Sequence, residues 1–115
     1  MTPPPAYIDC GPYRYTVHFD ADALAAVKAE KPDRDGWIGA CDHRGNRILV
    51  DPSMAFDQQI VTLWHEVRHL IYYTSGGVRV PAKPTQDDLI EQTEAVEVAV
   101  LRQNPGLVAF LTQPR

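Results

Sequence analysis

The sequence has little of what several large protein classes require. Its two cysteines, Cys10 and Cys41, show no C-x-x-C spacing, so nothing demands a disulfide or a cysteine metal site. Lysine and arginine form no cluster and the net charge is −4, which argues against nucleic-acid binding through a basic surface. No apolar run is long enough to cross a bilayer, and the start lacks the features of a signal peptide. We therefore expect a cytoplasmic protein with reduced thiols and with no membrane or nucleic-acid partner.

The 115 residues suffice for one domain, 1–115, with one modest core, and we expect a monomer. Runs of alternating, helical and turn-forming residues predict a small α+β domain. The expected elements are, in order, strand Tyr13–Phe19, helix Ala21–Lys31, strands Trp37–Asp42 and Arg47–Asp51 around the turn Arg44-Gly45-Asn46, and helices of about Met54–Ser75 and Thr85–Gln103. Asp20 or Asp22 is expected to cap the first helix. The apolar tail 107–111 is expected to pack back on the domain.

The segment His65-Glu66-Val67-Arg68-His69 is an H-E-x-x-H motif on the first long helix. Histidines at i and i+4 project from one helix face, so both imidazoles reach one zinc ion. Glu66 is too offset to ligate with them and is placed to take a proton from a zinc-activated water. The motif therefore predicts the metal ligands His65 and His69 and the general base Glu66.

The apolar residues around the motif predict which face of this helix is buried. They fall on one stripe that lies nearly opposite to the two histidines: Ile60, Leu63, Trp64, Val67, Leu70 and Ile71. The simpler alternative is a surface helix whose two histidines are solvated.

A catalytic zinc site needs a third protein ligand and an open position. No histidine follows His69, and the upstream His18 and His43 are expected to be surface or hydrogen-bonded residues. A carboxylate is the natural alternative. The last long helix carries Glu91, Glu94 and Glu97.

Glu94 is the preferred third ligand among these three glutamates. It projects from the middle of an apolar stripe formed by Ile90, Val98 and Leu101, where an ionised carboxylate is costly unless it is paired or binds metal. Glu97 and Glu91 remain alternatives. A buried salt bridge from Glu94 to Arg68 or Arg102 is the structural alternative to metal binding.

These motifs resemble those of the gluzincin metallopeptidases, above all the minigluzincins and the ImmA/IrrE-like peptidases. The similar segments are 62–70 around the motif, the strand 47–51 before it, and Glu94-Ala95-Val96-Glu97-Val98-Ala99, which is similar to the family segment E-A-x-x-F-A. Arg68 departs from the small or apolar residue of many relatives. The resemblance implies a small mixed sheet, an active-site helix and a glutamate helix. It also implies one Zn²⁺ held by His65, His69 and Glu94, with Glu66 as the base.

The expected activity is therefore hydrolysis of a peptide or protein substrate. Tyr72 is a candidate for stabilising the oxyanion, although packing is an ordinary role for it and for Tyr73. Asp51 and Asp57 are candidates for orienting the imidazoles, or else turn and cap residues. One rival function is a non-catalytic or latent zinc-binding module, with the tail 107–111 covering the cleft. Another is a helical adaptor without metal.

Overall fold

The computed structural model describes residues 2–74 and 85–114, which form a four-stranded sheet, four α-helices and one 3₁₀ turn. The α+β class predicted from the sequence is confirmed. The elements are β1 (Tyr7–Cys10), β2 (Tyr13–Phe19), α1 (Ala21–Lys28), the 3₁₀ turn Pro32–Arg34, β3 (Gly39–Asp42), β4 (Arg47–Val50), α2 (Phe56–Thr74), α3 (Gln86–Gln103) and α4 (Pro105–Thr112).

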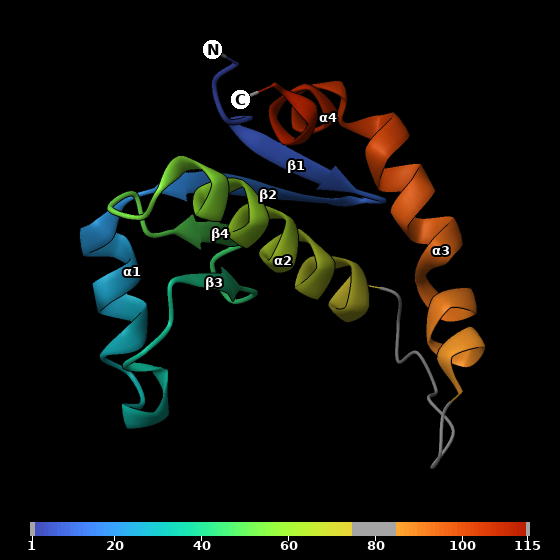
Figure 1. The fold of residues 1–115 in the computed structure, drawn as a ribbon. Helices are drawn as coiled ribbons and strands as arrows, with labels where there is room; N and C mark the ends of the chain where they lie inside the picture. The colour runs from blue at the N-terminus through green and yellow to red at the C-terminus, as the bar shows by residue number, and fades with distance from the viewer. Residues whose placement is uncertain (1, 75–84, 115) are drawn as a thin grey trace.

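The sheet is mixed, with the strand order β1-β2-β4-β3 (Figure 1). β1 pairs antiparallel with β2, β2 runs parallel to β4, and β3 pairs antiparallel with β4. The parallel pair requires a crossover, which α1 and the segment after it supply between β2 and β3. β3 is consequently an edge strand.

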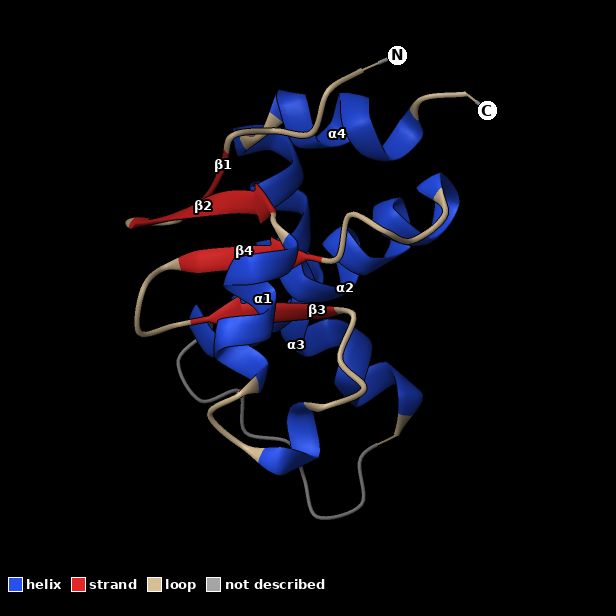
Figure 2. Cartoon of the chain, turned by 90° about the vertical axis from the view of Figure 1, so that its left-hand side faces the viewer, coloured by secondary structure: helices blue, strands red, loops and turns tan. Residues whose placement is uncertain are grey.

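Helices cover both faces of the sheet (Figure 2). Because successive strand residues point to opposite faces, Leu49 packs with α1 while its neighbours Ile48 and Val50 pack toward α2. On the α1 side a small cluster forms around Leu24 and Val27. The larger core lies on the α2 side, and it includes buried residues from β1, β2, α3 and α4.

The junction between α3 and α4 is tied to the outer edge of β1 by Asn104. Its side-chain Oδ1 accepts a hydrogen bond from the Asp9 backbone N–H at 2.8 Å. Its Nδ2 donates to the carbonyl oxygens of Asp9 at 2.6 Å and Val100 at 2.7 Å. Asn104 is buried, so these bonds satisfy polar groups that would otherwise be desolvated without partners.

The structure corrects several boundaries and adds two elements. The strand β1 was not expected, α1 ends at Lys28 instead of Lys31, and the tail 107–111 forms the helix α4. The tail does pack back on the domain, since Leu107 and Phe110 are buried. The predicted end of the long helix at Ser75 lies outside the described residues. Within the described part of the chain, no helix combines the length and the apolar character that a membrane crossing needs.

Candidate metal centre

The helix α2 presents its histidines opposite to the face that anchors it. The predicted apolar stripe is confirmed: Leu63, Val67, Leu70 and Ile71 are fully buried, and Ile60 and Trp64 pack partly buried against the same core. This packing fixes the rotation of α2 about its axis. His65 and His69 therefore remain exposed, one helical turn apart.

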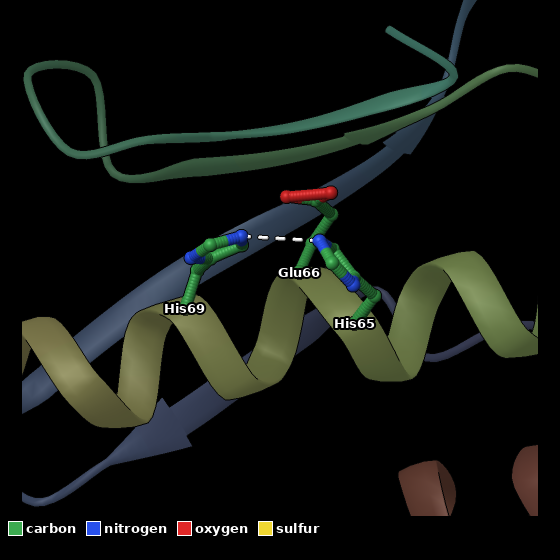
Figure 3. A group of neighbouring side chains, drawn as sticks. All are labelled: His65, Glu66 and His69. Atoms are coloured by element: carbon green, nitrogen blue, oxygen red, sulfur yellow. Dashed lines mark hydrogen bonds between the residues drawn. The ribbon is translucent and has the colours of Figure 1, made fainter.

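The two imidazoles lie at a distance that suits joint binding of one metal ion (Figure 3). The Nε2 atoms of His65 and His69 are 3.1 Å apart, and the ring centroids are 4.7 Å apart. Two nitrogens that each lie about 2.0–2.1 Å from a tetrahedral zinc ion are about 3.3 Å from each other. Burial and the neighbouring charge of His65 lower the pKa of His69, which favours the neutral imidazole that a metal requires. The two histidines are thus placed so that they could hold one metal ion.

Glu66 completes a compact group with the two histidines. One carboxylate oxygen and the two histidine nitrogens all lie within 4.8 Å of one another. Unlike the histidines, Glu66 is only 6% exposed, and Figure 3 shows its carboxylate pointing from α2 toward the strands β3 and β4. Burial raises the pKa of Glu66 to about 7. A group with this pKa exchanges protons readily at neutral pH, as a general base must.

Gly39 on β3 makes room for this carboxylate. A Cβ atom at position 39 would lie 3.0 Å from Glu66 Oε2, 2.7 Å from Thr62 Cγ2 and 3.1 Å from the Leu49 carbonyl oxygen. Only glycine therefore lets α2 approach the edge strand so closely.

The group opens into a pocket of about 500 Å³ between α2, β3 and the segment before β3. Trp37, Ile38 and Val61 give this pocket half-exposed apolar walls. Cys41 and His43 line it next to the histidines and Glu66. The pocket lining thus combines apolar side chains with imidazole, thiol and carboxyl groups.

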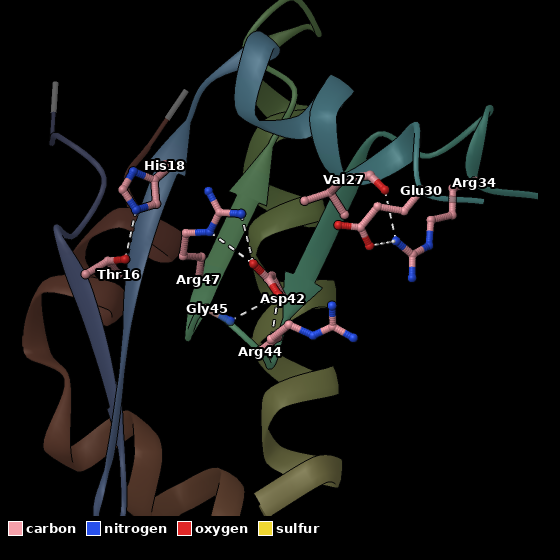
Figure 4. Close-up of polar contacts among 9 residues, drawn as sticks. All are labelled: Thr16, His18, Val27, Glu30, Arg34, Asp42, Arg44, Gly45 and Arg47. Atoms are coloured by element: carbon pink, nitrogen blue, oxygen red, sulfur yellow. Dashed lines mark hydrogen bonds and ion pairs between the residues drawn. The ribbon is translucent and has the colours of Figure 1, made fainter. Parts of the chain in front are cut away.

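Short-range hydrogen bonds hold the two segments that frame the pocket (Figure 4). In the turn between β3 and β4, the Asp42 carboxylate accepts hydrogen bonds from the backbone N–H groups of Arg44 and Gly45 and from the Arg47 guanidinium. The predicted turn is confirmed, with Asn46 in the left-handed region at φ 53°.

The segment before β3 is tied to α1 by Arg34. Its guanidinium donates to the Val27 carbonyl oxygen and to the Glu30 carboxylate, both drawn in Figure 4. The same guanidinium lies 5.1 Å from the Trp37 ring centroid. The apolar wall of the pocket is thereby attached to the rest of the fold.

The structure does not bring Glu94 to the histidines. Glu94 is exposed on α3, and among the described residues the group that could hold a metal ion contains only His65, Glu66 and His69. The premise for choosing Glu94 was wrong, because Ile90 is 50% and Val98 is 47% exposed. α3 buries the face with Thr93 and Val100 instead, since β1 and α4 pack there.

The other two glutamates of α3 also lie outside the group. Glu91 is exposed, and Glu97 forms an ion pair with Arg68 of α2 at 3.6 Å. The salt bridge considered for Glu94 is therefore made by Glu97. The role of Glu94 as third ligand stays a prediction, and it would require a different position of α3 relative to α2.

The pocket lining contains none of the other candidates from the sequence: Asp51, His18 and Tyr72. Asp51 is a turn residue, because its carboxylate accepts from the Ser53 backbone N–H and hydroxyl. His18 bonds to Thr16 at 2.8 Å on β2, away from the pocket lining. Tyr72 does not line the pocket, and none of the residues of α4 does, so the tail does not cover the cleft.

Sequence reasoning missed the pocket roles of Gly39, Cys41 and His43. Both cysteines are unpaired, and burial together with the negative charge of Glu66 raises the pKa of Cys41 to about 12. Cys41 is therefore a thiol and not a thiolate at neutral pH. No local pattern in the sequence signals these three residues. They reach the pocket because β3 pairs with β4 and thereby lies next to α2, and this contact joins segments that are distant in the sequence.

Comparisons with family models, with curated protein sequences and with solved structures gave no match for this chain.

Proposed function

We propose that this chain is a zinc-dependent metallopeptidase of the gluzincin type. The observation that carries the proposal is the arrangement of two histidine Nε2 atoms 3.1 Å apart beside the buried carboxylate of Glu66, in the lining of an open pocket. The pairing of exposed imidazoles with a buried acid is hard to explain as a packing feature, since burial without a partner penalises the charged acid. The cytoplasmic location and the monomeric state belong to the same proposal.

His65 and His69 would hold the ion, and the third protein ligand is proposed to be Glu94. When bound, zinc supplies a Lewis acid that polarises a carbonyl and lowers the pKa of water to about 7.

Glu66 handles the protons of the reaction. Its carboxylate takes a proton from the attacking water, whose oxygen bonds to the carbonyl carbon. The same carboxyl group then gives that proton to the departing amine nitrogen as the C–N bond breaks. With a pKa of about 7, Glu66 is equally able to accept and to return the proton near neutral pH.

The peptide substrate is proposed to bind in extended form along β3. Among residues 2–74 and 85–114 this strand pairs only with β4, and it contributes to the lining of the pocket that holds Glu66. Backbone hydrogen bonds to an edge strand would hold a peptide without requiring a particular side chain. The half-exposed Trp37 and Ile38 offer apolar contact for a substrate side chain nearby.

The test combines a metal assay with a digest of a fluorogenic peptide library. Wild-type protein is expected to bind one zinc per chain and to cleave, whereas Glu66→Gln is expected to bind zinc and not to cleave. The variants His65→Ala and His69→Ala are expected to lose zinc. Zinc binding without cleavage in the wild type would favour the non-catalytic or latent module. If the wild-type protein bound no zinc, the proposed metal site would be contradicted.

A further inference from the structure

A third histidine borders the pocket, outside the metal-ligating group. His43 follows β3 and lines the same pocket as His65, Glu66 and His69. It does not belong to the set of ligand atoms that lie within 4.8 Å of one another. His43 is therefore close to the site but is not placed as a ligand of the same ion.

The ring of His43 is held in one orientation by two tyrosines. Its face stacks on the Tyr73 ring, with centroids 3.7 Å apart and an interplanar angle of 11°. Its Nδ1 lies 2.9 Å from the hydroxyl oxygen of Tyr15, and this tyrosine is only 1% exposed. Stacking fixes the plane of the ring, and the hydrogen bond fixes its rotation within that plane.

The buried hydroxyl of Tyr15 also selects the tautomer of His43. If Nδ1 carried the proton, it would donate to the Tyr15 hydroxyl oxygen or to Cys41 Sγ, which lies 3.7 Å away, and the Tyr15 proton would have no acceptor in the described part of the chain. If Tyr15 donates to Nδ1, both groups are satisfied, and the ring proton sits on Nε2. Burial raises the pKa of Tyr15 to about 12, so the hydroxyl keeps the proton that it donates.

This leaves a fixed donor at the far edge of the ring. Nε2 lies on the side of the ring away from Tyr15, and within residues 2–74 and 85–114 it makes no hydrogen bond. A donor that is aimed in advance at a developing negative charge needs no reorganisation during the reaction.

We infer that His43 donates a hydrogen bond from Nε2 to the carbonyl oxygen of a peptide bound at the His65–His69 site, and that Tyr15 positions it for this role. The inference rests on the proposed peptidase function. His43 takes the role for which Tyr72 was considered. It stabilises the oxygen as negative charge develops there, so its effect falls on kcat more than on KM.

The test compares His43→Phe, which keeps a ring to stack on Tyr73 but has no donor, with His43→Gln, which keeps an N–H donor. Zinc affinity is expected to stay within a few-fold of wild type in both variants. With the best peptide of the library, His43→Phe is expected to lower kcat about 10²–10³-fold, the usual loss for one oxyanion donor, and His43→Gln to recover part of it. His18→Phe, a histidine outside the pocket, is the matched control and should keep wild-type kcat.

A second measurement does not depend on metal or activity. Nitrogen-15 NMR of the metal-free protein is expected to show the His43 proton on Nε2, and Tyr15→Phe is expected to weaken this preference. Tyr15→Phe should also lower kcat without changing zinc affinity. A folded His43→Phe protein can be verified by circular dichroism before the kinetics.

The outcomes separate the inference from the proposed function. If His43→Phe cleaves as fast as wild type while Glu66→Gln is inactive, the inference fails and the peptidase stands. If His43→Phe loses zinc, His43 is a ligand and the inference also fails. If wild type binds no zinc and cleaves nothing, the proposed function fails. In that case NMR still tests whether Tyr15 keeps the ring proton of His43 on Nε2. A proton on Nδ1 would contradict this part of the inference, and a proton on Nε2 would support it.

Discussion

Replacing Glu66 by glutamine should stabilise the metal-free protein at neutral and alkaline pH. The folded protein raises the pKa of Glu66 from 4.5 to about 7, and burial is the cause. The folded state therefore holds this proton more tightly than the unfolded chain does. The stability from the protonated carboxyl is fully present below about pH 4.5 and is lost as the pH rises through about 7.

The size of the effect follows from the same two pKa values. One pKa unit corresponds to about 1.4 kcal/mol, so a shift of roughly 2.5 units limits the loss to about 3 kcal/mol above pH 8. At pH 5 the loss is only about 1 kcal/mol, because it grows by about 1.4 kcal/mol per pH unit between the two pKa values and pH 5 lies close to the lower one, 4.5. Glutamine has the same shape and never ionises, so Glu66→Gln avoids this loss.

Urea unfolding of both proteins in the presence of a chelator, from pH 5 to pH 8.5, measures the difference. The advantage of Glu66→Gln should grow across this range to about 3 kcal/mol, or about 10 °C in Tm. Glu94→Gln is the matched control, since it makes the same substitution at a glutamate that is exposed on α3. Zinc should narrow the gap, because a nearby cation favours the ionised carboxylate. A difference that is zero, or that is constant with pH, would refute the reasoning.

Three further predictions concern other contacts. Gly39→Ala should lower the free energy of unfolding by about 1–3 kcal/mol, which thermal unfolding would measure. The new Cβ would lie 2.7 Å from the Thr62 methyl carbon and 3.1 Å from the Leu49 carbonyl oxygen. Asn104→Ala should cost about 2–3 kcal/mol in urea unfolding, because the Asp9 backbone N–H and carbonyl lose their buried partner. Glu94→Ala should weaken zinc binding in calorimetry and Glu97→Ala should not; the reverse result would transfer the ligand role to Glu97.

Local patterns were enough to predict the elements that carry the histidines. The stripe from Leu63 to Ile71 was read correctly, because one face of α2 is apolar and the other is not. The strand Tyr13–Phe19 and the turn at Gly45 were likewise set by short-range rules, namely alternation and turn chemistry.

Other features depend on contacts between distant segments, which no local pattern contains. Apolar residues lie on more than one side of α3. The stripe formed by Ile90, Val98 and Leu101 therefore did not reveal which side of the helix packs against β1 and α4. The helix α4 was not predicted, because a proline just after a helix favours its end and Pro105 here also occupies the first position of the next helix. His43 reached the pocket only through the pairing of β3 with β4 and through contacts with Tyr15 and Tyr73.

The amide group of Asn104 has a consequence for association with other chains. The amide forms hydrogen bonds with both the backbone N–H and the carbonyl oxygen of Asp9. It therefore occupies part of the sheet edge at β1, where another strand would otherwise pair. The opposite edge of the sheet is β3, and in the described residues no other strand pairs with its outer side. Of the two outer edges of the sheet, the one at β3 is therefore the more open to pairing with an extended chain, and pairing of another strand with β1 is hindered.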